Sequence, residues 1–243
     1  ILDPTWWTPS FFLVSPSSMA GGVGPAICGS LIQALIAAVI SIPLGVAAGI
    51  MLVEYPDSKI AKPTTFMVDV LAGVPSVVAA IFIFGIWISV LNFNLSAFAV
   101  ALALVLLMLP LIVRSTEEML KLVPDELREA SYALGVPKWK TIVSIVIPTA
   151  LSGMISGVFL AVARVMGETA PVLILVGYTA SYNYDVFQGN MASLPLLIYN
   201  QLSNPPDAGQ YRIWGAALTL VIIIGLANVL AAFASKALAP KTK

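Results

Sequence analysis

Long apolar runs alternate with short polar segments along nearly the whole chain. The runs cover about residues 27–53, 64–91, 95–113, 149–176 and 213–234. Each reaches the length of roughly 20 residues that an apolar helix needs to cross a bilayer. The pattern therefore predicts an all-α integral membrane protein with five transmembrane helices, the first kinked at Pro43.

The polar segments predict the connections between these helices. They cover residues 54–63, 92–94, 124–148 and 177–211. Residues 1–26 precede the first helix and contain no Lys or Arg. Aromatic side chains of the kind that favours a membrane interface occur there, at Trp6, Trp7, Phe11 and Phe12.

Composition supports a membrane protein and excludes several kinds of site. Hydrophobic residues make up 59% of the chain and charged residues 10%, with a mean hydropathy of +0.98, whereas soluble domains carry about 25% charge. The net charge of zero argues against nucleic-acid binding. With no histidine and the single cysteine Cys28, no metal site and no Cys–His catalytic site are expected.

Lysine and arginine predict the orientation in the membrane. Alternating spans place nine basic residues on one side: Lys59, Lys62, Lys121, Arg128, Lys138, Lys140, Lys236, Lys241 and Lys243. The opposite side holds Arg212, while Arg114 and Arg164 fall at a span end and within a span. By the positive-inside rule, segment 124–148 and the C-terminus are cytoplasmic and residues 1–26 face outward. An outward N-terminus without a signal peptide predicts a further transmembrane helix ahead of residue 1.

Segment 124–148 has the pattern of a helical hairpin. Asp125 is a suitable N-cap with Glu126 in the first turn, Gly135 predicts the end of the helix, and Pro137 can open the next one. One face of the helix carries residues at i, i+3, i+4 and i+7, namely Leu127, Ala130, Ser131 and Leu134. This small apolar face could dock onto a partner subunit. On spacing alone, an ordinary cytoplasmic hairpin fits equally well.

The same segment carries a more specific motif. Glu129, Ala130 and Ser131 are followed by Gly135 and later by Ile145, Ile147 and Pro148. This order resembles the EAA loop of ABC-importer permeases, with departures at Ser131 and Ile147. Further segments resemble the A-type permease subunits of phosphate ABC transporters, namely residues 21–31, 42–55, 69–78, 114–142, 163–171 and 191–199.

The resemblance implies a fold, a function and partners. It implies a type I ABC-importer permease core, normally of six helices, over residues 27–243, after an extracytoplasmic segment 1–26. Such a permease forms half of a phosphate pathway in a bacterial or archaeal cytoplasmic (inner) membrane. The implied partners are a homologous C-type permease, an ATPase dimer and an extracytoplasmic phosphate-binding protein. The resemblance also implies that the residues that couple the permease to the ATPase are Glu129, Ala130, Ser131, Leu134 and Gly135.

ATP hydrolysis is not expected of this chain. The glycine-rich run GGVGPAICG, residues 21–29, is not followed by Gly-Lys-Ser/Thr, so it is no Walker loop. ATP and Mg²⁺ would therefore bind to the partner ATPase. The chain is accordingly expected to be a permease subunit with no catalytic residues of its own.

Arg164 and Glu168 are the charges expected deepest in the membrane. At mid-span each costs about 2.5–3.5 kcal/mol on insertion scales. Their spacing of four predicts that they pair on one helix face, and Pro171 predicts a kink beside them. Broken helices that carry charges are a common way to build a transporter site. The alternative is an ion pair that only holds helices together.

The chemistry of the two side chains suits phosphate. Arginine can donate two parallel hydrogen bonds to two oxygens of the anion. Glu168 can neutralise Arg164 when no substrate is present. It can also accept a hydrogen bond from a protonated phosphate, which sulfate does not offer at neutral pH.

Other polar residues are weaker candidates for the pathway. Arg114, Glu117 and Glu118 follow the third span and can line an exit, although solvated interfacial charges fit equally well. Ser76, after Pro75, can offer a hydroxyl to substrate, and Asp69 is expected to be a helix-end charge.

Three functions remain open from the residues. The first is an importer permease for phosphate or another oxyanion. The second is a secondary transporter or channel that needs no ATPase, and the third is a membrane subunit that transports nothing.

Overall fold

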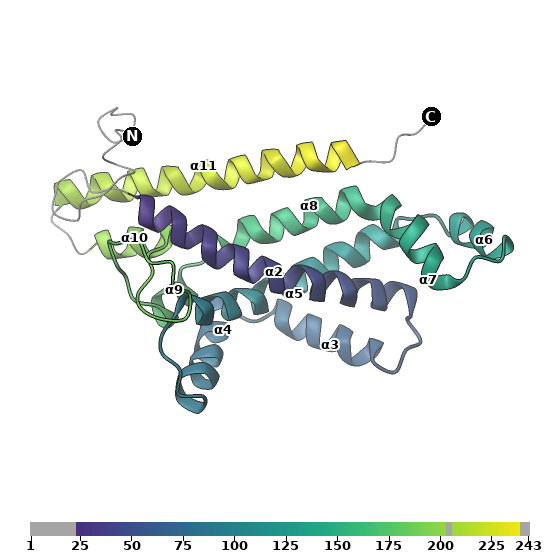
Figure 1. Cartoon of the computed structure of the whole chain (residues 1–243), viewed down its shortest axis with the longest axis horizontal. Coiled ribbons are helices and arrows are strands. Elements are labelled where there is room, and N and C mark those ends of the chain that lie inside the picture. Colours follow the sequence, from purple (N-terminus) through teal and green to yellow (C-terminus); the bar gives the residue numbers. More distant parts are fainter. Residues whose placement is uncertain (1–22, 203–205, 239–243) are drawn as a thin grey trace. The chain divides into compact units, whose positions relative to one another are not determined.

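The structure is a computed structural model that describes residues 23–202 and 206–238. Every regular element within those ranges is a helix, which confirms the all-α prediction (Figure 1). The longest are α2 (Gly24–Glu54), α5 (Ala97–Lys121), α8 (Ile147–Val165) and α11 (Pro206–Leu238). The interface prediction for Trp6, Trp7, Phe11 and Phe12 lies outside the described residues.

Shorter helices fill the intervals between the long ones. They are α3 (Ala61–Ala72), α4 (Ser76–Ile83), α6 (Asp125–Ala133), α7 (Lys138–Thr141), α9 (Ala170–Leu175) and α10 (Leu194–Gln201). Two π-helical stretches, η2 (Phe84–Val90) and η3 (Ile142–Val146), continue α4 and α7.

Four helices in the described part are long and apolar enough to span a membrane, or five if the broken pair around Pro75 is one span. The first spanning helix runs through Pro43 as a single element. The second apolar run, 64–91, is not a single helix, because α3 ends at Ala72 and α4 begins at Ser76. Pro75 caps α4 in an extended conformation, with φ −62° and ψ 145°, and its ring disfavours helical backbone at the preceding residue.

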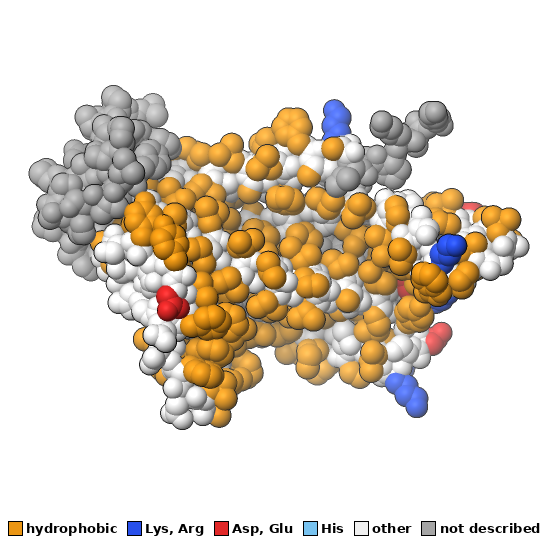
Figure 2. Space-filling model, in the orientation of Figure 1, with side chains coloured by type: hydrophobic (Ala, Val, Ile, Leu, Met, Phe, Trp, Pro, Cys, Tyr) orange, Lys and Arg blue, Asp and Glu red, His pale blue; other side chains and the backbone are white. Residues whose placement is uncertain are grey.

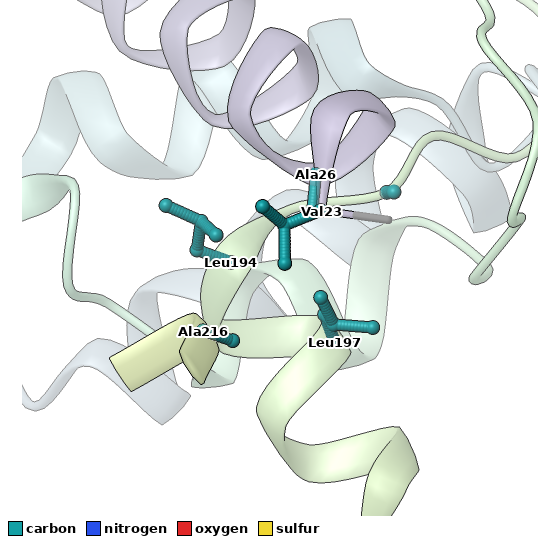
Figure 3. Packing of buried hydrophobic residues seen from close by; sticks show 6 residues of the cluster. Val23, Ala26, Leu194, Leu197 and Ala216 are labelled. Carbon is teal, nitrogen blue, oxygen red and sulfur yellow. The ribbon is translucent and has the colours of Figure 1, made fainter. Parts of the chain in front are cut away.

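The polar segment after the fourth span contains a helix that the hydrophobic pattern did not predict. Ser193 caps α10, and its hydroxyl accepts a hydrogen bond from Leu196 N at 3.4 Å. Leu194 and Leu197 are buried against Val23 and Ala26 at the start of α2 (Figure 3). Tertiary burial of these leucines stabilises a helix too short to persist alone.

The chain forms two compact units. Four of the five boundaries between them fall within the long helices α2, α5, α8 and α11, and the fifth falls between α3 and α4. Unit 1 comprises residues 1–38, 74–107 and 164–225, and unit 2 comprises residues 39–73, 108–163 and 226–243. Unit 1 contains the α10 cluster described above. Each unit has its own buried apolar cluster; that of unit 2 includes Leu120, Val146 and Met154.

Two GxxxG motifs allow close helix packing inside unit 2. On α2, a Cβ at Gly45 or Gly49 would collide with Ile112 or Thr116 of α5. On α8, a Cβ at Gly153 or Gly157 would collide with Met119 or Ser115 of the same α5. Small residues at this spacing let helices approach within a membrane, where hydrophobic burial contributes little to their association.

Hydrophobic side chains cover most of the face seen in Figure 2, and charged side chains are few on it. Large apolar side chains stay exposed along the helices, among them Leu35, Phe66 and Val221. Such a surface suits lipid or another membrane subunit.

Candidate functional site

The first candidate site is a helix break in unit 1. The fourth span begins at Lys138, earlier than expected, and α8 stops at Val165. Gly167 N and Glu168 N bond to the carbonyls of Arg164 and Val165 at 3.3 and 3.1 Å in a closing turn. Helix α9 then starts at Ala170, with Pro171 in its first turn. The kink predicted beside Pro171 is instead a full break of the helix, which lies between Val165 and Ala170.

Arg164 and Glu168 lie on either side of the end of α8. Arg164 is exposed in the last turn of that helix, and Glu168 is half-buried in the break. Among the residues that the structure describes, neither side chain makes an ion pair or a hydrogen bond. The predicted i,i+4 pairing is therefore wrong, because the helix that would align the two side chains ends between them.

A small cavity adjoins the break within unit 1. Its polar lining comes from Ser30, Gln33, Glu168 and Ser193, and its apolar lining includes Val165 and Val172. The cavity brings Glu168 together with α2 and the cap of α10. Sequence analysis did not single out the three uncharged polar residues. Ser30 and Gln33 stand alone in an apolar run and Ser193 lies in a polar segment, so no spacing marks them as one site.

The second candidate site is the α6 hairpin in unit 2. Pro124 is the residue that caps α6, so the expectation of Asp125 as N-cap is wrong. The Asp125 carboxylate instead accepts a hydrogen bond from Arg128 Nη1 at 3.1 Å. The predicted end at Gly135 is confirmed: its φ is +76°, and Val136 N bonds back to Ser131 O at 3.2 Å. Pro137 lies just before the first residue of α7.

Four of the five predicted coupling residues are exposed on the hairpin. They are Glu129, Ala130, Leu134 and Gly135, and Leu134 is 83% exposed. Ser131 is the exception, at 3% exposure, and its hydroxyl lies 2.8 Å from that of Thr141. Ser131 thus faces the interior of the hairpin, and its departure from alanine in the motif has a structural role.

Arg128 is a half-buried side chain that links several helices, whereas the sequence identified it only as a positive charge. Its guanidinium donates to Glu54 Oε1 from Nε at 3.3 Å and from Nη2 at 3.1 Å. It also donates to the carbonyls of Leu120 and Val123, at 3.0 and 2.7 Å. The Glu54 side chain is 4% exposed and that of Arg128 13%. One side chain therefore joins α6 to the ends of α2 and α5.

Lys138 strengthens the same junction. Its amine donates to the backbone carbonyl of Glu54 and lies 4.4 Å from the centre of the Tyr55 ring. We call Glu54, Asp125, Arg128 and Lys138 the Arg128 cluster. Glu54 and Arg128 are 74 residues apart, so no local spacing could have predicted their contact.

The remaining pathway candidates do not form one site. In unit 2, Arg114 pairs with Asp69 and with Glu117, the latter at 2.7 Å, and Glu117 pairs with Lys121 at 2.7 Å. Glu118 is exposed. Ser76 opens α4 in unit 1. Unlike Arg164, Arg114 is already engaged by two carboxylates.

Comparison with known proteins gives a family match over most of the chain. The family described as "Binding-protein-dependent transport system inner membrane component" matches residues 41–243. The "Phosphate transport system permease protein PstA 1" of Mycobacterium tuberculosis (strain ATCC 25618 / H37Rv) is 63% identical over 227 residues, 93% of this chain and 74% of the relative. The corresponding protein of Xylella fastidiosa (strain 9a5c) is 39% identical over 218 residues, 89% of this chain and 76% of the relative.

Solved structures show a similar fold at low sequence identity. An inward-facing MetNI methionine ABC transporter matches with a TM-score of 0.70 at 17% identity, over 90% of this chain and 95% of that one. An amino acid ABC transporter crystallised with histidines matches with a TM-score of 0.62 at 16% identity, over 87% and 89% of the two chains.

Proposed function

The chain belongs to the family of binding-protein-dependent transport system inner membrane components, and we propose from this premise that it is the permease subunit of an ATP-driven phosphate importer. Its relatives at 63% and 39% identity are phosphate permeases, and the likeness extends over most of the chain. It is a multi-pass membrane protein with several apolar helices. It is not itself an enzyme.

The partners follow from this assignment. An ABC-importer permease works with an ATPase and a substrate-binding protein. We further propose a homologous C-type permease as the second half of the pathway and a dimer of ATPase subunits that binds ATP and Mg²⁺. The positive-inside distribution supports an inner-membrane orientation with the hairpin and C-terminus in the cytoplasm.

The proposal for the substrate pathway rests on the lack of a described partner for Arg164. Its guanidinium is exposed at the end of α8, where no described side chain pairs with it. A cation in an apolar span without an internal partner is expected to face a water-filled path or another subunit. A phosphate ion would satisfy its planar array of donors with two parallel hydrogen bonds.

Uptake of radiolabelled phosphate tests this role. Arg164→Gln should reduce uptake by at least about 30-fold, since truncating one partner of a desolvated charge contact costs about 2 kcal/mol or more. Insertion should be unimpaired, because removing a charge from a span eases insertion. Lys236→Gln removes an exposed cation near the end of α11 and is the matched control.

A double variant distinguishes a role of Arg164 and Glu168 in transport from a purely structural role. If Arg164 and Glu168 only stabilised helices, Arg164→Gln with Glu168→Gln would restore uptake through a neutral hydrogen-bonded pair. We expect no restoration, because the two side chains do not pair in the described structure. Uptake near wild type in the double variant would remove the assigned site.

Cysteine labelling tests the orientation. A cysteine at Ser58, between α2 and α3, should react with impermeant thiol reagents only from the cytoplasm, and one at Asn183 only from outside. Thr242, a third cytoplasmic site, lies outside the described residues. Reaction of all three from the same side would contradict the topology.

A further inference from the structure

Gln33 is a buried polar residue that the transport mechanism above does not use. It lies in the first third of the apolar helix α2 and is 2% exposed. Its amide nitrogen, Nε2, has no hydrogen-bond partner among the described residues. Burying an amide donor without an acceptor is unfavourable, so such a group normally meets a water molecule or a ligand.

The surroundings of Gln33 supply what a water molecule needs. Gln33 lines the cavity beside the helix break together with Glu168, Ser30 and Ser193. A buried water usually has two to four polar partners. The Gln33 amide can donate to it and the Glu168 carboxylate can accept from it.

Both serine hydroxyls remain able to donate. Ser30 Oγ accepts from Leu194 N at 2.8 Å, and Ser193 Oγ accepts from Leu196 N at 3.4 Å. Each oxygen is therefore held by a backbone donor, while its own hydrogen stays available to a neighbour. The cap of α10 and the side of α2 thus bring two further donors to the lining of the cavity.

The size of the cavity indicates the ligand. It offers about 10 Å³ to the centre of a water molecule, which is room for one water and not for a phosphate ion. We propose that this cavity binds one structural water that joins the Gln33 amide to the Glu168 carboxylate. Gln33 is thereby a positioning residue, which holds Glu168 in the orientation that meets the substrate. This inference rests on the proposed phosphate-import function.

The proposed water would hold the Glu168 carboxylate on one side and leave its other side free for the substrate. Glu168 follows the end of α8 and has no described ion pair to hold its side chain. A water held by α2 would fix the carboxylate from inside unit 1 and leave its other lone pairs for a protonated phosphate. Loss of the amide should then impair phosphate recognition more than folding.

The test measures the KM for radiolabelled phosphate in vesicles that contain the complete importer. Gln33→Met removes the amide and keeps an unbranched side chain of similar length. We expect its KM to rise about tenfold, as small displacements of a substrate-contacting group do. Gln33→Leu repeats the test with a branched side chain in place of the amide. A folding defect in one of the two variants would then not decide the result.

Thr116→Val is the matched control. Thr116 is fully buried, and its hydroxyl oxygen also lacks a described partner, but it belongs to unit 2 and lines no part of this cavity. Its KM should stay at the wild-type value. A tenfold rise here as well would mean that loss of any buried polar group has this effect, and would overturn the inference.

A double-mutant cycle separates positioning from structure. Glu168→Asp keeps the charge and withdraws it by one methylene group. If Gln33 acts through Glu168, Gln33→Met should change KM less than about twofold in the Glu168→Asp background, since coupled sites are not additive. The same tenfold change in both backgrounds, or no change in either, would overturn the inference. Wild-type KM in Glu168→Asp alone would instead count against the pathway role of Glu168.

Discussion

Two groups of charged residues in this protein differ in how they are satisfied. In the Arg128 cluster of unit 2, one guanidinium bonds to a buried carboxylate and to two backbone carbonyls. At the helix break of unit 1, Arg164 and Glu168 have no charged partner in the described part of the chain. Both groups lie in a mostly apolar protein, where a charge without a partner is costly.

The difference indicates what each group is for. Charges that are paired and hydrogen-bonded inside one unit hold helix ends together. Charges left without a partner remain available to a substrate or another subunit, which is the role that we propose for Arg164 and Glu168. The same contrast separates Arg114, which Asp69 and Glu117 engage, from Arg164.

Breaking the Arg128 cluster should give the largest loss of stability. Arg128→Gln leaves the buried Glu54 carboxylate without its cation, and removal of one partner of a buried pair costs about 3 kcal/mol. Arg164→Gln should change stability by less than about 0.5 kcal/mol, as expected where no partner is lost. Thermal unfolding of both purified variants in one detergent measures the difference, and equal losses would remove the distinction.

A change in the turn after α6 should uncouple transport from ATP hydrolysis. Its effect on stability should be smaller than that of Arg128→Gln. Gly135 has φ +76°, which proline at about −65° cannot adopt, so Gly135→Pro must rebuild the turn. We expect the variant to stay in the membrane while phosphate uptake per ATP hydrolysed falls several-fold. Glu129→Arg, which alters only an exposed side chain of the hairpin, should act in the same direction.

The coupling prediction also has a clear negative outcome. Normal uptake by both hairpin variants, at normal amounts in the membrane, would contradict a role in coupling. Tyr132→Ala, which truncates another exposed side chain of α6, would then show whether any part of this surface contributes.

The smallest effect is expected at Ser131. Ser131→Ala restores the alanine of the motif but removes the hydroxyl that bonds to Thr141. One lost hydrogen bond costs about 1 kcal/mol, and Thr141 keeps a contact to the carbonyl of Pro137 at 3.4 Å. Thermal unfolding should show this modest loss, while uptake stays normal because Ser131 is buried. Loss of uptake would indicate that Ser131 does take part in docking to the ATPase.

Much of the fold follows from local properties of the chain. The apolar runs predicted the spanning helices, because hydropathy and length decide whether a helix suits a bilayer. Gly135 predicted the end of α6, since a positive φ is a local requirement that glycine meets without strain. Pro171 predicted a kink in the fourth span from a similarly local restriction, and the helix breaks just before this residue.

The predictions that were wrong concern features that depend on contacts between distant parts of the chain. Helix α10 was missed because its stability comes from leucines buried against α2. The pairing of Arg164 with Glu168 was predicted from a continuous helix, and the chain departs from that helix after Val165. Ser131 was placed on the docking face by its spacing, although its bond to Thr141 turns it inward.

The sequence by itself determined the class of protein, most of its spanning helices and the position of the hairpin, and it supplied the residues that we propose for phosphate. Those properties depend on hydropathy, backbone restrictions and residue chemistry, all of which act over a few neighbouring positions. Only the tertiary structure decided which charges are satisfied: Arg128 reaches Glu54 across 74 residues, and Gln33 of α2 shares a cavity with Glu168. Contacts of this kind depend on how separate helices pack, which no local pattern contains.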